Sequence, residues 1–133
     1  MTCIQTSPDV EKNARLIIQK WFDLLKEGKV QEISDLYDEN ADFLPTFSPL
    51  FVHEHEGVED YFKHFISKKP IGIIIEDSIR FLCCDCFLHE GMYDFEVGDV
   101  NNRQMIHARF TFIWQKTDDD SWKIVHHHSS VRP

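Results

Sequence analysis

The spacing of hydrophobic residues divides the chain into two parts with different periods. Up to residue 69, apolar residues recur every three or four positions, which is typical of helices with one buried face. From Ile71 onward the period changes to two, which is typical of strands. The pattern therefore predicts helices first and an antiparallel meander after them, the order of an α+β domain.

The first helix is predicted over 9–27, where the apolar residues form one continuous face. Ser7 can cap this helix, Pro8 occupies its first position, and Asp9 meets the positive end of the helix dipole. Gly28 is expected to end it. The apolar face needs a partner surface.

Two more helices and a short strand are predicted between residues 30 and 70. The second helix is short, ends in the polar turn 38–40, and carries a stripe of Val30, Ile33 and Tyr37. A strand at 41–44 follows and is stopped by Pro45. The third helix is expected at 58–69, before Pro70, because proline disfavours helix in the residue that precedes it.

The rest of the chain reads as antiparallel strands joined by hairpin connections at 98–103 and 117–121. One set of strand residues predicted to share a face is Ile73, Ile75, Ile79 and Phe81. The predicted fold class is α+β, with three N-terminal helices on one face of a strongly curved antiparallel sheet of four to six strands. Residues 1–133 are expected to form a single domain, a cone whose mouth is a natural small-molecule pocket.

Charge and composition narrow the classes of partner. The chain has 133 residues, with 14 Lys and Arg against 23 Asp and Glu, a formal charge of −9. A surface this acidic repels phosphate backbones and anionic headgroups, so neither nucleic acid nor a membrane is an expected partner. With 42% hydrophobic residues the chain can bury a sizeable core, which argues against disorder.

The sequence predicts a cytoplasmic protein with free thiols. No run approaches the roughly 18 apolar residues of a membrane span, and residues 1–7 lack the regions of a signal peptide. Cys3 is far from the other cysteines, and Cys83, Cys84 and Cys86 are too crowded for an ordinary disulfide framework. A zinc site at these three cysteines and His89 is disfavoured, because an extended strand does not provide the tight turn that tetrahedral zinc needs.

The run His126-His127-His128 is the most conspicuous polar feature. A metal site is weakly supported, because residues two apart on a strand stand about 7 Å apart and no third ligand is fixed by spacing. Structural hydrogen bonding, acid–base chemistry and anion binding stay open. The period groups His126 and His128 on one face and His127 with Ser129 on the other, but a bulge can exchange the faces.

Arg109 lies in the middle of an apolar, aromatic strand, where a charge needs a partner. A salt bridge to Glu90, Asp94 or Glu96 on the preceding strand is one interpretation, and a pocket arginine that binds a carboxylate is the other. The candidate ligand-binding residues are Arg109, Tyr37 and His107. The candidate catalytic residues are His126, His128 and Tyr93, although Asp42 can also serve in acid–base chemistry and no pair is fixed by spacing.

Five stretches resemble stand-alone proteins of the SgcJ/EcaC type, which are similar to the association (hub) domain of calcium/calmodulin-dependent protein kinase II. Both belong to the nuclear transport factor 2-like, polyketide-cyclase-like superfamily. The stretches are 36–46, 61–65, 68–72, 108–112 and 122–130. The resemblance implies a cone-shaped α+β fold. It also implies assembly through the outer face of the sheet into dimers and rings, as in the kinase hub, whereas other relatives are isomerases, cyclases and dehydratases.

The resemblance implies a different pocket from that of the kinase hub. The hub lines its pocket with arginines that hold small carboxylates, and Phe112 and Ser129 stand at the aligned positions here. The hub's carboxylate site is therefore not carried over, and Arg109 is the candidate for another one. No kinase domain accompanies the chain, so kinase activity is not inherited.

Two functions of different classes follow from the sequence. The first is a self-associating module, a homodimer or larger ring, with a pocket for a small acidic or hydrophobic ligand. The alternative is a cofactor-free isomerase, cyclase or dehydratase in which His126 or His128 is the general base and Arg109 or Tyr93 stabilises negative charge. A receptor that only binds a small acid would lack the proton-transfer group. No metal or cofactor is expected.

Overall fold

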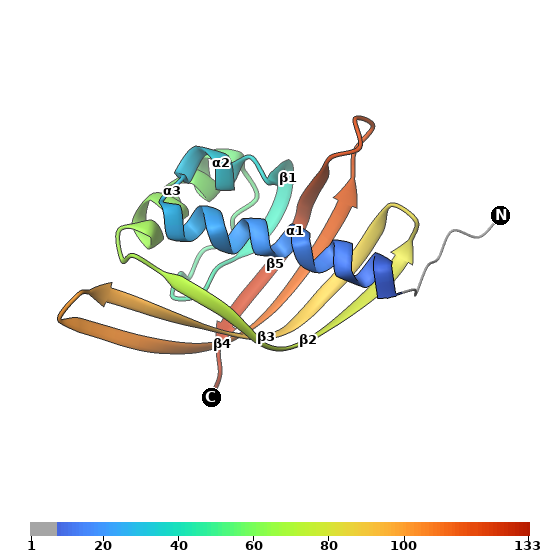
Figure 1. Ribbon diagram of the computed structural model, residues 1–133. Coiled ribbons are helices and arrows are strands. Elements are labelled where there is room, and N and C mark those ends of the chain that lie inside the picture. Colours follow the sequence, from blue (N-terminus) through green and yellow to red (C-terminus); the bar gives the residue numbers. More distant parts are fainter. Residues whose placement is uncertain (1–7) are drawn as a thin grey trace.

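The computed structural model describes residues 8–133 and has the predicted α+β architecture. In chain order the elements are α1 (Pro8–Glu27), α2 (Val30–Ser34), β1 (Tyr37–Leu44), α3 (His55–Ile66), β2 (Ile71–Cys83), β3 (Cys86–Asp99), β4 (Asn102–Lys116) and β5 (Trp122–Val131). Figure 1 shows α1 lying across one face of a curved sheet, with α2 and α3 over one end of the same face. The opposite face, called the outer face here, is covered by no helix among residues 8–133.

The five strands form one sheet in the order β1-β5-β4-β3-β2. The strands β2 to β5 form the predicted antiparallel meander. The first strand differs from the prediction, because β1 pairs parallel with β5. A parallel pair needs a long crossover, and here the chain from α3 through β4 separates the two partners.

The structure contains the three predicted helices, but some of their ends differ from the prediction. Gly28 ends α1 with a φ of 75°, whereas the proposed cap Ser7 lies outside the described residues. The helix α2 is shorter than predicted, and Tyr37 opens β1 because the backbone N–H of Ile124 on β5 donates to the carbonyl of Leu36 at 2.7 Å. The helix α3 starts at residue 55 and ends at 66, ahead of a turn in which Lys69 has a φ of 54°.

A β-bulge in β2 breaks the single face that the sequence predicts for Ile73, Ile75, Ile79 and Phe81. The register between β2 and β3 shifts between Ile74 and Glu76, so Ile75 is an extra residue. Ile75 is 52% exposed, whereas Ile79 and Phe81 pack against the core. Ile73, which precedes the bulge, is 62% exposed as well. Strict alternation placed all four residues on one face, which is wrong because a bulge exchanges the two faces of the strand beyond it.

The core lies between α1 and the sheet and is built around Trp21. This side chain is 2% exposed, and its indole contacts rings from α1, α3, β3, β4 and β5. Phe112 on β4, at 5.2 Å between ring centroids, is among the nearest of these rings. The predicted apolar face of the first helix therefore packs on the aromatic face of the sheet.

The cysteines only partly follow the prediction. Cys83 and Cys86 are free, whereas Cys84 is disulfide-bonded, so the prediction of free thiols is wrong for Cys84. The close spacing of cysteines in the sequence does not determine whether one of them forms a disulfide, because a disulfide depends on the distance between two cysteines in the fold. Cys3 lies outside the described residues. In the described part of the chain, no helix combines the length and apolar character that crossing a bilayer requires.

Candidate functional site

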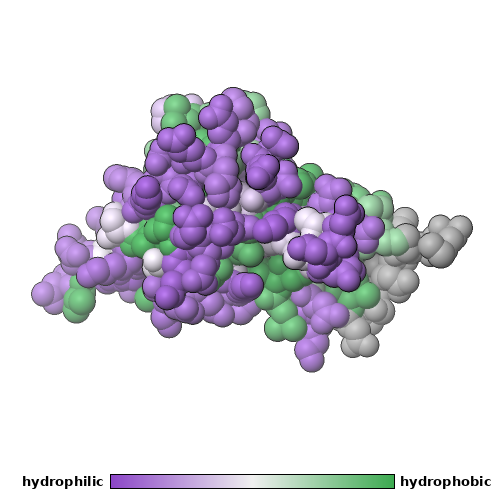
Figure 2. All heavy atoms as spheres, turned by 90° about the horizontal axis from the view of Figure 1, so that it is seen from above, coloured by the Kyte–Doolittle hydropathy of each residue, from purple (hydrophilic) through white to green (hydrophobic). Residues whose placement is uncertain are grey.

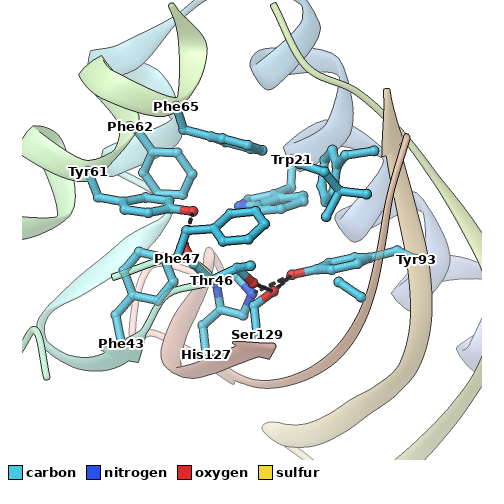
Figure 3. A pocket seen from close by; sticks show the side chains of 13 residues that line it. Trp21, Phe43, Thr46, Phe47, Tyr61, Phe62, Phe65, Tyr93, His127 and Ser129 are labelled. Atoms are coloured by element: carbon cyan, nitrogen blue, oxygen red, sulfur yellow. Dashed lines mark hydrogen bonds between the residues drawn. The ribbon is translucent and has the colours of Figure 1, made fainter. Parts of the chain in front are cut away.

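A small cavity lies between the helices and the sheet, where the mouth of the cone was predicted. Its volume is about 20 Å³, enough for roughly one water molecule. Aromatic side chains fill most of the hollow, and Phe47 from the loop after β1 reaches in among them (Figure 3). The lining residues are Trp21, Phe43, Thr46, Phe47, Tyr61, Phe62, Phe65, Tyr93, Phe95, Ile106, Ala108, His127 and Ser129.

The polar groups beside the cavity are joined in one chain of hydrogen bonds. The indole N–H of Trp21 donates to the Tyr37 hydroxyl at 3.2 Å, and that hydroxyl lies 2.8 Å from His127 Nδ1. The other ring nitrogen, Nε2, lies 3.2 Å from the Tyr93 hydroxyl. Tyr93 donates to Ser129 Oγ at 2.6 Å, and Thr46 Oγ1 lies 2.6 Å from the same oxygen (Figure 3).

The donors along this chain fix the tautomer of His127. Tyr93 donates its only proton to Ser129, so at its contact with His127 it can only accept, and Nε2 of His127 is the donor. Nδ1 of the neutral ring is then the acceptor and receives the proton of Tyr37, whose oxygen accepts from the indole N–H of Trp21. The neutral imidazole then carries its proton on Nε2 and donates it to the Tyr93 hydroxyl. Both ring nitrogens are occupied, so His127 has no free nitrogen to act as a general base.

Burial keeps every titratable group of this chain neutral. Desolvation lowers the pKa of His127 well below its ordinary value, and the neighbouring histidines His126 and His128 lower it further. Desolvation also raises the pKa of Tyr37 and Tyr93 well above that of free tyrosine. The site is therefore an uncharged hydrogen-bonded relay rather than an acid–base pair.

The structure separates the predicted site residues between the two faces of the sheet. Tyr93 lines the cavity, and the buried Tyr37 lies behind it, bonded to His127. His107 and Arg109 are exposed on the outer face of β4. Neither contacts the cavity, so a ligand held there would not meet them.

The other two histidine candidates also lie on the outer face. His126 pairs with Ile113 and His128 pairs with Thr111, and both partners alternate with the buried residues of β4. Burial lowers the pKa of His126, an effect that Asp42 partly opposes. Since neither side chain lines the cavity, the proposed general base of the enzyme hypothesis is not in the hollow.

Sequence reasoning did not select the residues that form the polar end of the cavity, His127, Ser129 and Thr46. The period correctly grouped His127 with Ser129, but the face was open because a bulge shifts the register between β4 and β5 before His126. The pairing of β5 with the aromatic strand β4 is the signal that would have identified the inner face. His127 lies opposite Phe112, with ring centroids 3.9 Å apart, and Ser129 lies opposite Phe110.

Two further findings concern metals and the ion pairs of the inner face. Among residues 8–133, no three His, Cys, Asp or Glu side chains come together to hold a metal ion. Asp77 accepts from Arg15 at 3.1 Å and lies 2.8 Å from Nε2 of the buried His89. Burial alone would raise the pKa of Asp77, but the hydrogen bonds from Arg15 and His89 together lower it. This cluster ties α1 to β2 and β3.

The outer face carries unpaired charges beside apolar side chains. Arg109 on β4 lies in register with Met92 on β3, which in turn lies opposite Glu76 on β2. These three residues and Glu90 line a hollow of about 500 Å³. In the described part of the chain, Arg109, Glu76 and Glu90 form no ion pair.

Comparison with known families decides what kind of domain this is. The model of the calcium/calmodulin dependent protein kinase II association domain matches residues 11–133. The chain belongs to the association domain family. The resemblance to this domain, predicted from the sequence, is thereby confirmed, and the fold is that of nuclear transport factor 2-like proteins.

Solved structures support the assignment of this association domain. A protein from Xanthomonas campestris assigned to the same association domain is 32% identical, with a TM-score of 0.90, over 99% of this chain and 96% of that one. A dehydratase-like protein of the nuclear transport factor 2-like family from Streptomyces avermitilis is 14% identical, with a TM-score of 0.82, over 96% and 99% of the two chains. The second likeness shows the fold alone. A comparison with curated proteins finds no match.

Proposed function

We propose that this association domain joins two copies of itself through the outer faces of their sheets, around a two-fold axis. The family assignment supports self-association. The outer face is the candidate surface, because no helix among the described residues covers it. In a two-fold interface the same patch serves both copies, so the groups that complement each other must occur together in one patch.

The observation that carries this proposal is the arrangement of Arg109 with Glu76 and Glu90. An arginine and two glutamates without ion pairs border one hollow on the outer face. A two-fold rotation can place Arg109 of each copy against a glutamate of the other copy. Both arginines then gain a carboxylate partner in the same interface. An arginine suits such a pair better than a lysine does, because its guanidinium can form two parallel hydrogen bonds with one carboxylate.

Apolar side chains elsewhere on the outer face add apolar area to the proposed interface, which the charged groups alone do not provide. Ile73 is 62% exposed on β2, and Met105 is 52% exposed on β4. Half-buried Leu88 and Ile113 lie opposite one another on the outer face of β3 and β4. Burying such side chains against a second copy contributes about 25 cal/mol per Å² of apolar surface.

The side of the helices offers a poorer surface for association. Seen from above, where the helices lie, most of the surface is hydrophilic and hydrophobic residues are confined to separate patches (Figure 2). A dimer needs one surface, whereas a larger ring needs a second one. The mass in solution therefore separates the two forms of the proposal.

Charge reversal at the centre of the outer face tests the proposal. The unaltered chain at tens of micromolar is expected to sediment at twice the monomer mass or a multiple of it. Arg109→Glu places a third acid beside Glu76 and Glu90 in each copy, so the dissociation constant is expected to rise at least tenfold. Lys20→Glu makes the same change of charge on the exposed side of α1 and is expected to leave association unchanged.

Either of two results contradicts the proposal. The first is a strictly monomeric chain at tens of micromolar. The second is an oligomer that Arg109→Glu leaves intact while the α1 variant dissociates it, because association would then use the side of the helices. Circular dichroism on each variant shows that the fold is retained, since both replaced side chains are exposed.

A further inference from the structure

The hydrogen-bonded chain beside the cavity holds one proton more than it has bonds for. Six groups carry one donor proton each: Trp21, Tyr37, His127, Tyr93, Ser129 and Thr46. Only five hydrogen bonds join them. Because Tyr93 donates to Ser129, the protons of Trp21, Tyr37, His127 and Tyr93 are all used within the chain, and the surplus proton belongs to Ser129 or Thr46. Both of these residues line the cavity.

A hydroxyl proton that has no acceptor at the cavity wall determines which kind of polar group a ligand can place there. The group that meets Ser129 and Thr46 must accept a hydrogen bond, because the remaining protons of the chain are already donated. A carbonyl oxygen does this without a donor of its own. The chain of bonds behind Ser129 also polarises it, which strengthens the last donor.

The remaining walls exclude a charged ligand and favour a flat, apolar one. No Lys, Arg, Asp or Glu of the described residues lines the cavity, and desolvation lowers the pKa of His127 well below its ordinary value. A carboxylate beside Ser129 would therefore be buried without a counter-charge in the cavity lining, at a large cost. Lys68 lies over the Phe47 ring, with Nζ 5.9 Å from its centroid, and does not line the cavity. Trp21, Tyr61 and Phe65 present rings that stack on another ring.

Phe47 controls the size of the space. Its side chain lines the cavity although it is 69% exposed, and its φ of 65° is strained for a residue other than glycine. The loop is held on both sides of Phe47. The Thr46 hydroxyl bonds to Ser129, Tyr61 donates to the Thr46 carbonyl at 3.2 Å, and Val52 pairs with Phe43. The ring can therefore turn outward while these bonds persist.

We propose that this cavity binds a small, uncharged aromatic ketone or aldehyde, whose carbonyl oxygen accepts a hydrogen bond from Ser129 or Thr46 and whose ring takes the place of the Phe47 ring. Phe47 is the gate of this site. The proposal does not rest on self-association, because the cavity and the outer face lie on opposite sides of the sheet.

Removing the gate tests the site with acetophenone as the probe. Phe47→Ala is expected to bind acetophenone at least ten times more tightly than the unaltered chain in isothermal titration calorimetry, since the space left by the phenyl ring is added to the cavity. Phe51→Ala is the matched control. It removes an exposed ring from the same loop that does not line the cavity, and it is expected to change nothing.

Two further measurements test the chemistry of the ligand. Benzoate, which has nearly the same shape, is expected to bind Phe47→Ala at least ten times more weakly than acetophenone. The carbonyl stretch of bound acetophenone is expected at a lower frequency than in hexane, because a hydrogen bond weakens the C=O bond. Unchanged affinity in Phe47→Ala, tighter binding of benzoate, or a carbonyl band at its hexane position would each overturn the proposal.

Discussion

At the scale of the residue, His127 organises the interior of the domain. Its ring is stacked between Phe43 and Phe112, at 4.8 and 3.9 Å between centroids, and its two nitrogens join Tyr37 to Tyr93. This ties β1, β3, β4 and β5 together through one side chain. An imidazole in this position is stable only while it is neutral, because a second ring proton would face the proton of Tyr37.

The stability of the domain should therefore fall as the pH falls below 6.5. In the unfolded chain a histidine takes up a proton near that pH, whereas folding lowers the pKa of His127 well below it. Below this pH the unfolded state binds more protons than the folded state. The contribution of His127 to the free energy of unfolding is therefore fully present above pH 7, and it decreases by about 1.4 kcal/mol per pH unit below pH 6.5. Urea denaturation at pH 7, 6 and 5 measures the slope.

His127→Phe provides the comparison for that slope. The variant keeps the stacked ring but leaves Tyr37 and Tyr93 each without one partner, which should cost about 1–3 kcal/mol per hydroxyl at pH 7. Its loss of stability between pH 7 and 5 should be smaller than that of the unaltered chain. An equal slope in the two proteins would mean that His127 is not the group that resists protonation.

At the scale of the element, bulges decide what the strands expose. The period of two that is predicted from Ile71 onward holds in β3 and β4, where no bulge interrupts the pairing of the two strands. It failed in β2, where the extra residue is Ile75, and it left the faces of β5 open. A bulge depends on contacts with the neighbouring strand, so the sequence of one strand alone does not reveal it.

Gly91 should be the least replaceable residue of this bulge. It lies opposite Asp77, and a Cβ atom built on it would be 2.0 Å from the backbone carbonyl oxygen of Glu76. The backbone of β2 would have to move, so Gly91→Ala should destabilise the fold by about 3 kcal/mol. Gly28→Ala, whose added atom meets nothing closer than 3.6 Å, should cost only about 1 kcal/mol through its positive φ.

Chemical denaturation of both glycine variants measures the difference. A Gly91 variant as stable as the Gly28 variant would show that the bulge can relax without loss of stability.

Elements that do not depend on such long-range contacts could be predicted from the sequence. The first helix follows from its local periodicity and its end from Gly28, whereas the pairing of β1 with β5 joins residues about 85 positions apart.

At the scale of the whole molecule, the domain separates two surfaces that the sequence could not assign. Arg109 was a candidate for the pocket and for the outer face alike, and the curvature and register of the sheet place it on the outer face. The pocket was predicted as an open hollow, yet aromatic side chains leave about 20 Å³. Its volume depends on how many rings turn inward, which follows from packing rather than from the order of residues.

The central claim is that two copies of this association domain meet through the outer faces of their sheets. Isotope-filtered nuclear Overhauser measurements on a mixture of labelled and unlabelled chains test it most directly, because they detect only contacts between copies. Contacts between methyl groups of Ile73, Met92, Met105 and Ile113 of the two copies are expected. Contacts confined to Leu16 on α1 or Leu50 in the loop after β1, or none at tens of micromolar, would contradict the claim.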